Sequence, residues 1–266
     1  MSTSSITSGE VCSARRRRPG TLEVGNRVTN ELGRLRHARR AAVLAVLFAG
    51  ASAADRALRA QSPEELDSGT FDLLVNGRVV GTERFVVRHD GTSIRAAARV
   101  TLEPGADALV GGEIRLLLDA GFRPNRYELR PEDGPLRSVV GIRQGNRLRL
   151  QTASEEGERV KEFVAPPRLS VLERGIAHHY FLLLQQLGDD FGTATVSLVV
   201  PSEGRQFRAT VREEGAESVR VGQETVPSRK YVIEGGGETH AVWAGEDGRV
   251  LRAEIPGRGW VARRRP

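Results

Sequence analysis

Histidine and carboxylate side chains are the residues of this sequence that could do chemistry, and two histidines, His178 and His179, are adjacent. Imidazole acts as a general base or metal ligand near neutral pH. Adjacent residues of a helix point ~100° apart, so this pair cannot hold one metal ion as histidines four positions apart can. We therefore predict a solvated or packing role for both, and no metal site. Glu238 and His240 could form an acid–base pair on a loop.

Other catalytic patterns lack their required context. Asp189-Asp190-Phe191-Gly192 has the letters of a kinase metal-binding motif, but the catalytic and glycine-rich loops of a kinase are missing. The glycine run 235–237 precedes no helix, so it does not indicate a phosphate cradle. The only cysteine, Cys12, precedes the folded part of the chain. We expect no catalytic residues and no cofactor.

Net charge argues against nucleic-acid binding. The chain has 40 basic and 34 acidic residues, and residues 1–53 hold nine of the former and three of the latter, which leaves 31 of each in the remainder. A neutral remainder lacks the one-sided basic field that binds phosphates. Nucleic acid is therefore not an expected partner.

Residues 34–53 have the three parts of a secretory signal. A basic stretch leads into an apolar run at 41–50, and Ala51-Ser52-Ala53 follows as a small-x-small cleavage site. The apolar run is too short to span a bilayer. We expect cleavage after Ala53, a periplasmic or secreted bacterial protein, and no membrane span after cleavage. Residues 1–33 are expected to be a disordered extension, and residues 54–69 a flexible linker.

Period-two alternation and turn dipeptides dominate from Phe71 onward, and Asn76-Gly77 is a strong hairpin signal. Ile94 to Leu102 alternates apolar with polar residues, as a strand with one buried face does. We expect strands at 71–75, 78–80, 82–88, 94–102, 113–119, 125–130, 137–143, 147–153, 158–164, 193–200, 205–213, 217–222, 229–234, 239–244, 249–255 and 259–263.

One helix interrupts the strands. Ser170-Val-Leu-Glu173 matches a capping box, and Gly188 can end the helix, which predicts a helix near 171–187. An apolar stripe at helical spacing supports it, formed by Leu172, Ile176, Tyr180, Leu183, Leu184 and Leu187. The predicted fold is all-β, a mainly antiparallel, curved half-barrel or clam-like sheet with one central amphipathic helix. Residues 70–266 are expected to form a single domain.

Several short stretches resemble a family of uncharacterised exported bacterial proteins, domain of unknown function 3108. They are Val75 to Gly81, Ser197 to Pro201, Val219 to Gly222, Val226 to Ile233, Ala241 to Trp243, Gly248 to Pro256 and Val261-Ala262, and the similarity extends over most of 70–262. The resemblance implies a curved antiparallel half-barrel in the periplasm and no known activity. The family's acidic residue before the central helix is absent here, where Gly175-Ile176 stands.

The leading functional hypothesis is a non-enzymatic protein that binds a ligand or maintains the envelope. An apolar or amphipathic ligand, such as a lipid, glycolipid or other envelope component, would lie in the concave face of the sheet. The residues expected to line it are Tyr180, Phe181, Tyr231 and Trp243; core packing is the alternative for each of them.

Two alternatives remain open. A hydrolase of envelope polymers would use His240, Glu238 or His178 as base and would place it in a polar cleft, because a triad assembles in space. A structural partner of an outer-membrane assembly would instead show an exposed edge strand or apolar patch.

Overall fold

The computed structural model describes residues 63–106 and 109–266. The predicted extension 1–33 and signal 34–53 lie outside these residues. The described elements are β1 (Glu64–Val75), β2 (Arg78–His89), β3 (Ser93–Leu102), β4 (Gly112–Asp119), β5 (Pro124–Arg130), β6 (Leu136–Gln144), β7 (Arg147–Ser154), β8 (Gly157–Val164), β9 (Leu169–Val171), α2 (His178–Leu187), β10 (Thr193–Val200), β11 (Arg205–Val221), β12 (Glu224–Gly235), β13 (Glu238–Ala244), β14 (Val250–Ile255), η1 (Pro256–Arg258) and β15 (Trp260–Arg264).

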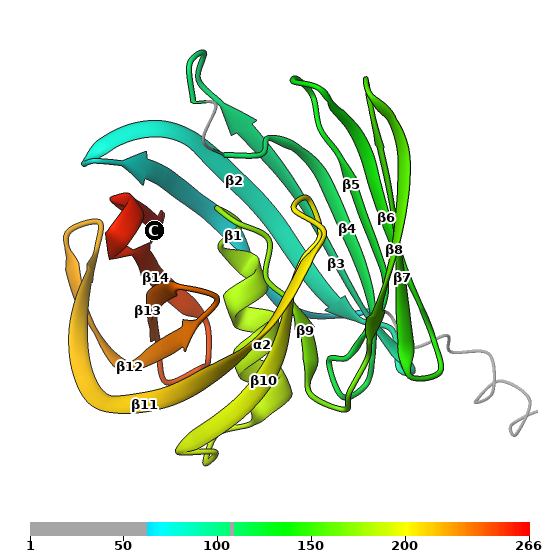
Figure 1. The fold of residues 1–266 in the computed structure, drawn as a ribbon. Coiled ribbons are helices and arrows are strands. Elements are labelled where there is room, and N and C mark those ends of the chain that lie inside the picture. Colours follow the sequence, from blue (N-terminus) through cyan, green and yellow to red (C-terminus); the bar gives the residue numbers. More distant parts are fainter. Residues whose placement is uncertain (1–62, 107–108) are drawn as a thin grey trace, which may run out of the picture. The chain divides into compact units, whose positions relative to one another are not determined.

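The strands form one curved sheet (Figure 1) in the order β8-β7-β6-β5-β4-β3-β2-β1-β15-β14-β13-β12-β11-β10-β9. Neighbouring strands are antiparallel, except that β9 pairs in parallel with β10. The first and last strands of the chain, β1 and β15, are neighbours in the middle of the sheet. The two ends of the sheet are therefore β8 and β9. This architecture confirms the predicted fold class.

Most predicted strands are present, with three differences. Two pairs of expected strands are each one strand: 78–80 and 82–88 form β2, and 205–213 and 217–222 form β11, with a register shift between Glu213 and Gly215. The linker prediction 54–69 was wrong from Glu64 onward, since β1 starts there. Its first residues, Glu-Glu-Leu-Asp-Ser-Gly, lack apolar alternation because a buried acid, Asp67, takes a position facing the core.

The third difference is the start of the helix, which begins at His178 and not near 171. Residues 169–171 form β9 instead, and Gly175 has a φ of +80°, which an α-helix does not accommodate. The Glu173 carboxylate does not close a capping box, because it accepts hydrogen bonds from Ser202. The predicted cap is therefore replaced by contacts from distant strands.

The main core lies between α2 and the inner face of the sheet. Its largest side chains come from far apart in the sequence, including Phe71, Tyr127, Tyr180 and Trp260. The first seven residues of α2 are all buried. A helix that is buried on every side has packing partners around its whole circumference, and the curved sheet supplies them (Figure 1).

A buried ion pair joins the first and last strands of the described chain, β1 and β15. Arg264 donates to both Asp67 carboxylate oxygens, at 3.1 and 2.6 Å, and also to the Ser68 carbonyl. Its guanidinium lies over the rings of Phe71 and Phe85. The Asp67 side chain is fully buried and the Arg264 side chain nearly so, while the half-exposed Arg249 lies 3.5 Å from the same carboxylate.

We predict that Arg264→Met strongly destabilises the fold, by about 3–5 kcal/mol, because it leaves the Asp67 carboxylate buried without its main partner. Arg265→Met is the matched control one residue away: its pair with Asp72 is half exposed and is expected to contribute at most about 1 kcal/mol. Urea unfolding of both variants measures the difference. Equal losses of unfolding free energy in the two variants would show that the buried pair stabilises the fold no more than the exposed pair does.

Candidate functional site

Three of the four aromatic residues expected to contact a ligand lie in the main core. Tyr180, Phe181 and Tyr231 are all buried, and Tyr231 stacks on Phe191. Their contact with a ligand stays a prediction.

Trp243 faces the opposite side of the sheet. It lies across from Lys230 in the β12–β13 register, whereas Tyr231 lies across from Val242. It belongs to a separate small cluster with Val219 and Leu251. The four aromatic residues therefore do not line one surface.

The start of α2 is capped by a buried carboxylate from β2. Glu83 accepts hydrogen bonds from the backbone N–H groups of Ala177, at 2.6 Å, and His178, at 2.9 Å. The His178 ring nitrogen Nδ1 lies 2.6 Å from the same carboxylate. Both side chains have no exposed surface. The first N–H groups of a helix have no partner within it, and a carboxylate there also favourably opposes the helix dipole.

A second buried acid, Glu173, fixes the segment before the helix to the β10–β11 turn. Its carboxylate accepts from the Ser202 N–H at 2.9 Å and the Ser202 hydroxyl at 2.5 Å, and from Tyr127 at 3.3 Å. Its own N–H donates to His179 Nδ1 at 3.0 Å. Burial raises the pKa of Glu173, and burial lowers the pKa of His179 well below its ordinary value.

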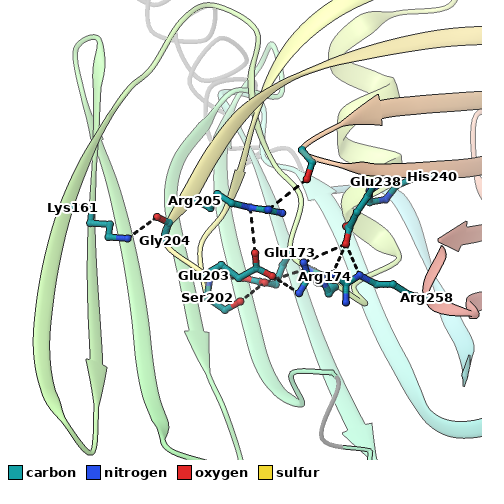
Figure 2. Close-up of polar contacts among 11 residues, drawn as sticks. Lys161, Glu173, Arg174, Ser202, Glu203, Gly204, Arg205, Glu238, His240 and Arg258 are labelled. Carbon is teal, nitrogen blue, oxygen red and sulfur yellow. Dashed lines mark hydrogen bonds and ion pairs between the residues drawn. The ribbon is translucent and has the colours of Figure 1, made fainter. Parts of the chain in front are cut away.

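A chain of ion pairs continues from this segment toward the surface (Figure 2). Arg174 contacts Glu203 in the β10–β11 turn and Glu238 at the start of β13. Arg258 also pairs with Glu238, and Arg205 pairs with Glu203 at 3.3 Å. These five residues tie the β10–β11 turn to the segment before the helix and to the β12–β13 turn. The turn next to β8 is therefore held in place from inside the protein.

His240 is buried beside this network. Its Nδ1 lies 2.8 Å from the Tyr180 hydroxyl, and its Nε2 is 3.7 Å from Glu238, beyond hydrogen-bond distance. Burial lowers the pKa of His240 to about 4; Glu238 raises it, and Arg174 and Arg258 lower it. The imidazole is therefore neutral near neutral pH.

The hydrolase hypothesis requires a polar cleft, and the histidines do not lie in one. His178 meets a carboxylate, but both are fully buried, so no substrate reaches them. The rings of His178 and His179 are 4.5 Å apart, and neither Nε2 has a hydrogen-bond partner among the described residues. Of the two roles predicted for this pair, solvated or packing, their burial leaves packing, since the sheet also contacts the side of α2 opposite its apolar stripe. Within residues 63–106 and 109–266 no group of side chains is arranged to hold a metal ion.

A surface pocket of about 360 Å³ lies elsewhere, on the outer face of β2, β3 and β4. Three arginines surround it, Arg84, Arg99 and Arg115, and the last two pair with Glu113. It lies on the face of the sheet opposite α2, so it is not part of the polar cluster.

Two side-chain hydrogen bonds join β8 to the β10–β11 hairpin, and no strand ladder connects these two elements within the described residues. Lys161 on β8 donates to the Gly204 carbonyl at 3.0 Å (Figure 2), and Gln206 on β11 donates to the Val164 carbonyl at 2.7 Å. We call this line between β8 and the β10–β11 hairpin the seam.

One edge of β8 is unpaired. Backbone groups of alternate residues in an antiparallel strand point to the same side. The Val164 carbonyl points to the seam, and the Ala165 N–H points back to Asn146 at the start of β7. Three further residues of β8 lie an even number of positions from Val164: Glu158, Val160 and Glu162. Their backbone N–H and C=O groups therefore also point away from β7. No backbone hydrogen bond within the described residues reaches these groups. We call them the open edge.

Exposed apolar side chains lie in the open edge, at Val160, and beside it, at Val164. Val160 is 49% and Val164 is 53% exposed, the two highest values among the exposed large hydrophobic residues of the described chain. Because β8 has eight residues in unbroken register with β7, it presents a regular template for another strand. The open edge and the seam are the candidate functional site.

Sequence reasoning missed the buried acids that position this site. Glu83 follows the period-two phase of Phe85 and Val87, which face the core. An acid in the buried phase of a strand is the signal that could have identified it. Glu173 had no such signal, since it was taken for part of a capping box.

The sequence matches no known protein family and no curated protein. Among solved structures, the chain is similar to a β-barrel-like protein of domain of unknown function DUF1849 from Brucella abortus. The two are 13% identical, with a TM-score of 0.45, over 74% of this chain and 94% of that chain. No family match supports the assignment to domain of unknown function 3108. No argument about the site rests on the structural likeness.

We predict that acid destabilises the protein partly through His240. The unfolded chain binds a proton on this histidine below a pH of about 6.5, whereas the folded chain does so only near its pKa of about 4. Stability therefore falls as the pH falls through this window, by about 3 kcal/mol from this group. His240→Gln removes the titration and should lose less stability between pH values of about 7 and about 4.5. Urea unfolding at both pH values tests this, and an equal loss in the variant would contradict it.

Proposed function

We propose that this chain is an exported, non-enzymatic interaction protein of the bacterial cell envelope, and that a partner chain docks on the open edge of β8. The observation that carries the proposal is that Val160, in the middle of a regular edge strand, has unpaired backbone groups and a half-exposed apolar side chain. Addition of a strand to an exposed sheet edge is a common mode of peptide recognition, because main-chain hydrogen bonds supply affinity.

At the opposite end of the sheet, the edge strand β9 is protected against pairing with another chain. Strand β9 has three residues, all buried, and is paired to β10. Short edge strands are one way in which proteins avoid unwanted pairing. Strand β8 has neither a short length nor a bulge, and its protection against pairing is limited to charged side chains such as the inward-facing Lys161.

A ligand in the concave face is less well supported than docking. Side chains of α2 and of the surrounding strands fill this face. An apolar or amphipathic ligand would have to displace well-packed groups such as Phe181 and Leu183, at a cost of a few kcal/mol for each large side chain.

Export is part of the proposal and rests on the tripartite pattern of residues 34–53. Among the described residues, no helix has the length and hydrophobicity needed to cross a membrane. The described part of the chain contains no cysteine, so its stability in an oxidising compartment does not depend on disulfides.

We predict that a photo-crosslinking residue at Val164 captures a specific partner in envelope fractions, and that Val160→Pro removes the adduct. Proline at Val160 deletes an N–H that makes no bond to β7, so an edge strand tolerates it. The variant should therefore stay folded at the temperature of the crosslinking experiment, which thermal unfolding checks.

The crosslinker at Val79 is the matched control. This valine is also surface-exposed, at 42%, but lies at the tip of the β1–β2 hairpin. The same adduct from both positions, or an adduct from Val164 that survives Val160→Pro, would contradict docking at the open edge.

A further inference from the structure

We propose that the open edge of β8 selects an extended partner segment with basic residues at positions i and i+4 and an apolar residue at i+2. This inference rests on the proposed docking function and adds the chemistry of the partner. It is carried by the three side chains of the open edge, which alternate in the order acid, valine, acid.

The three side chains share the outer face of the sheet. Leu148 and Leu150 on β7 are buried, and their partners Phe163 and Lys161 therefore face inward. Glu158, Val160 and Glu162 are in the other phase and are exposed. A strand added at the open edge would place three alternate side chains beside them, since cross-strand neighbours have Cβ atoms about 4.5–5.5 Å apart.

Both acids of the open edge are available for a basic partner. Neither Glu158 nor Glu162 makes an ion pair with the described residues. Glu158 accepts one hydrogen bond, from Gln151 at 3.0 Å, and Glu162 lies across from Arg149 in register without pairing to it. Two unpaired carboxylates on one side of an edge strand attract basic side chains at the matching positions.

Strand β8 and the turn before it contain more acidic than basic residues. Residues 155–164 contain four acids and two bases. Of the bases, Arg159 pairs with Glu156 and Lys161 binds the Gly204 carbonyl across the seam. Arg147 and Arg149 of β7 are exposed on the same outer face, so the acid excess is confined to β8 and its turn and acts on a partner strand that lies directly beside it.

The same charges disfavour a second copy of this chain as the occupant. Two open edges paired antiparallel about Val160 would place Glu158 of one copy opposite Glu162 of the other. Like charges directly opposite each other destabilise a strand pair. A partner with basic residues is therefore favoured over self-association.

Binding of two labelled peptides to the full chain tests the proposal. The first peptide has lysines at positions i and i+4 and valine at i+2, with threonine elsewhere; the second has glutamates in place of the lysines. Fluorescence anisotropy should show the lysine peptide binding about tenfold more tightly, from two attractive pairs replacing two repulsive ones. The difference should shrink as salt is added.

Substitutions in β8 test whether the peptides bind at the open edge. The double variant Glu158→Lys, Glu162→Lys should reverse the preference between the peptides, and Val160→Pro should abolish binding of both. Glu246→Lys is the matched control, because this acid is exposed in the turn between β13 and β14, far along the sheet from β8. It should leave the preference unchanged.

The outcomes separate this inference from the docking proposal. Equal binding of both peptides that Val160→Pro abolishes would overturn the charge selection and leave docking intact. Absence of binding by the lysine peptide would also overturn the charge selection, while the crosslink from Val164 decides docking on its own. A preference that persists in the double variant would place the binding elsewhere and overturn the inference.

Discussion

The capping of α2 by Glu83 is the interaction on which the rest of the structure depends. A buried carboxylate from β2 satisfies the first N–H groups of the helix, at 2.6 and 2.9 Å, and so fixes the helix against one half of the sheet. In the segment before the helix, the Glu173 carboxylate accepts a hydrogen bond from the Ser202 N–H, and Arg174 forms an ion pair with Glu203. Contacts from β2 thus fix the start of the helix, and contacts from the segment before the helix fix the β10–β11 turn, which borders the seam.

This arrangement explains why the sheet stays open. The turn that faces β8 is anchored to the interior by Glu173 and Arg174, so it is not free to move over and complete a ladder with β8. Two side chains, Lys161 and Gln206, bridge the gap instead. The unpaired groups of β8 are then a consequence of how the helix is held, and they are available because the core on the other side of the sheet is already filled.

Local patterns predicted the strands and failed where distant contacts decide the structure. Alternation and turn dipeptides such as Asn76-Gly77 identified nearly every strand, because these signals are read within a few residues. The start of the helix depends on Glu83, nearly a hundred positions away, so a local capping box was misleading. The aromatic residues proposed as ligand contacts were chosen by type alone, and register places Trp243 on the other face from Tyr231. Side chains that face an open edge could not be found from sequence, since strand order is not a local property.

The most direct test of the account is residue-resolved amide hydrogen exchange of the full chain without a partner. The account predicts fast exchange for Val160 and Glu162, whose N–H groups point out of the sheet, and slow exchange for Lys161 and Phe163, which bond to β7. Slow exchange throughout β8 would contradict it. That result would show that the open edge is already occupied, by another part of this chain or by a second copy.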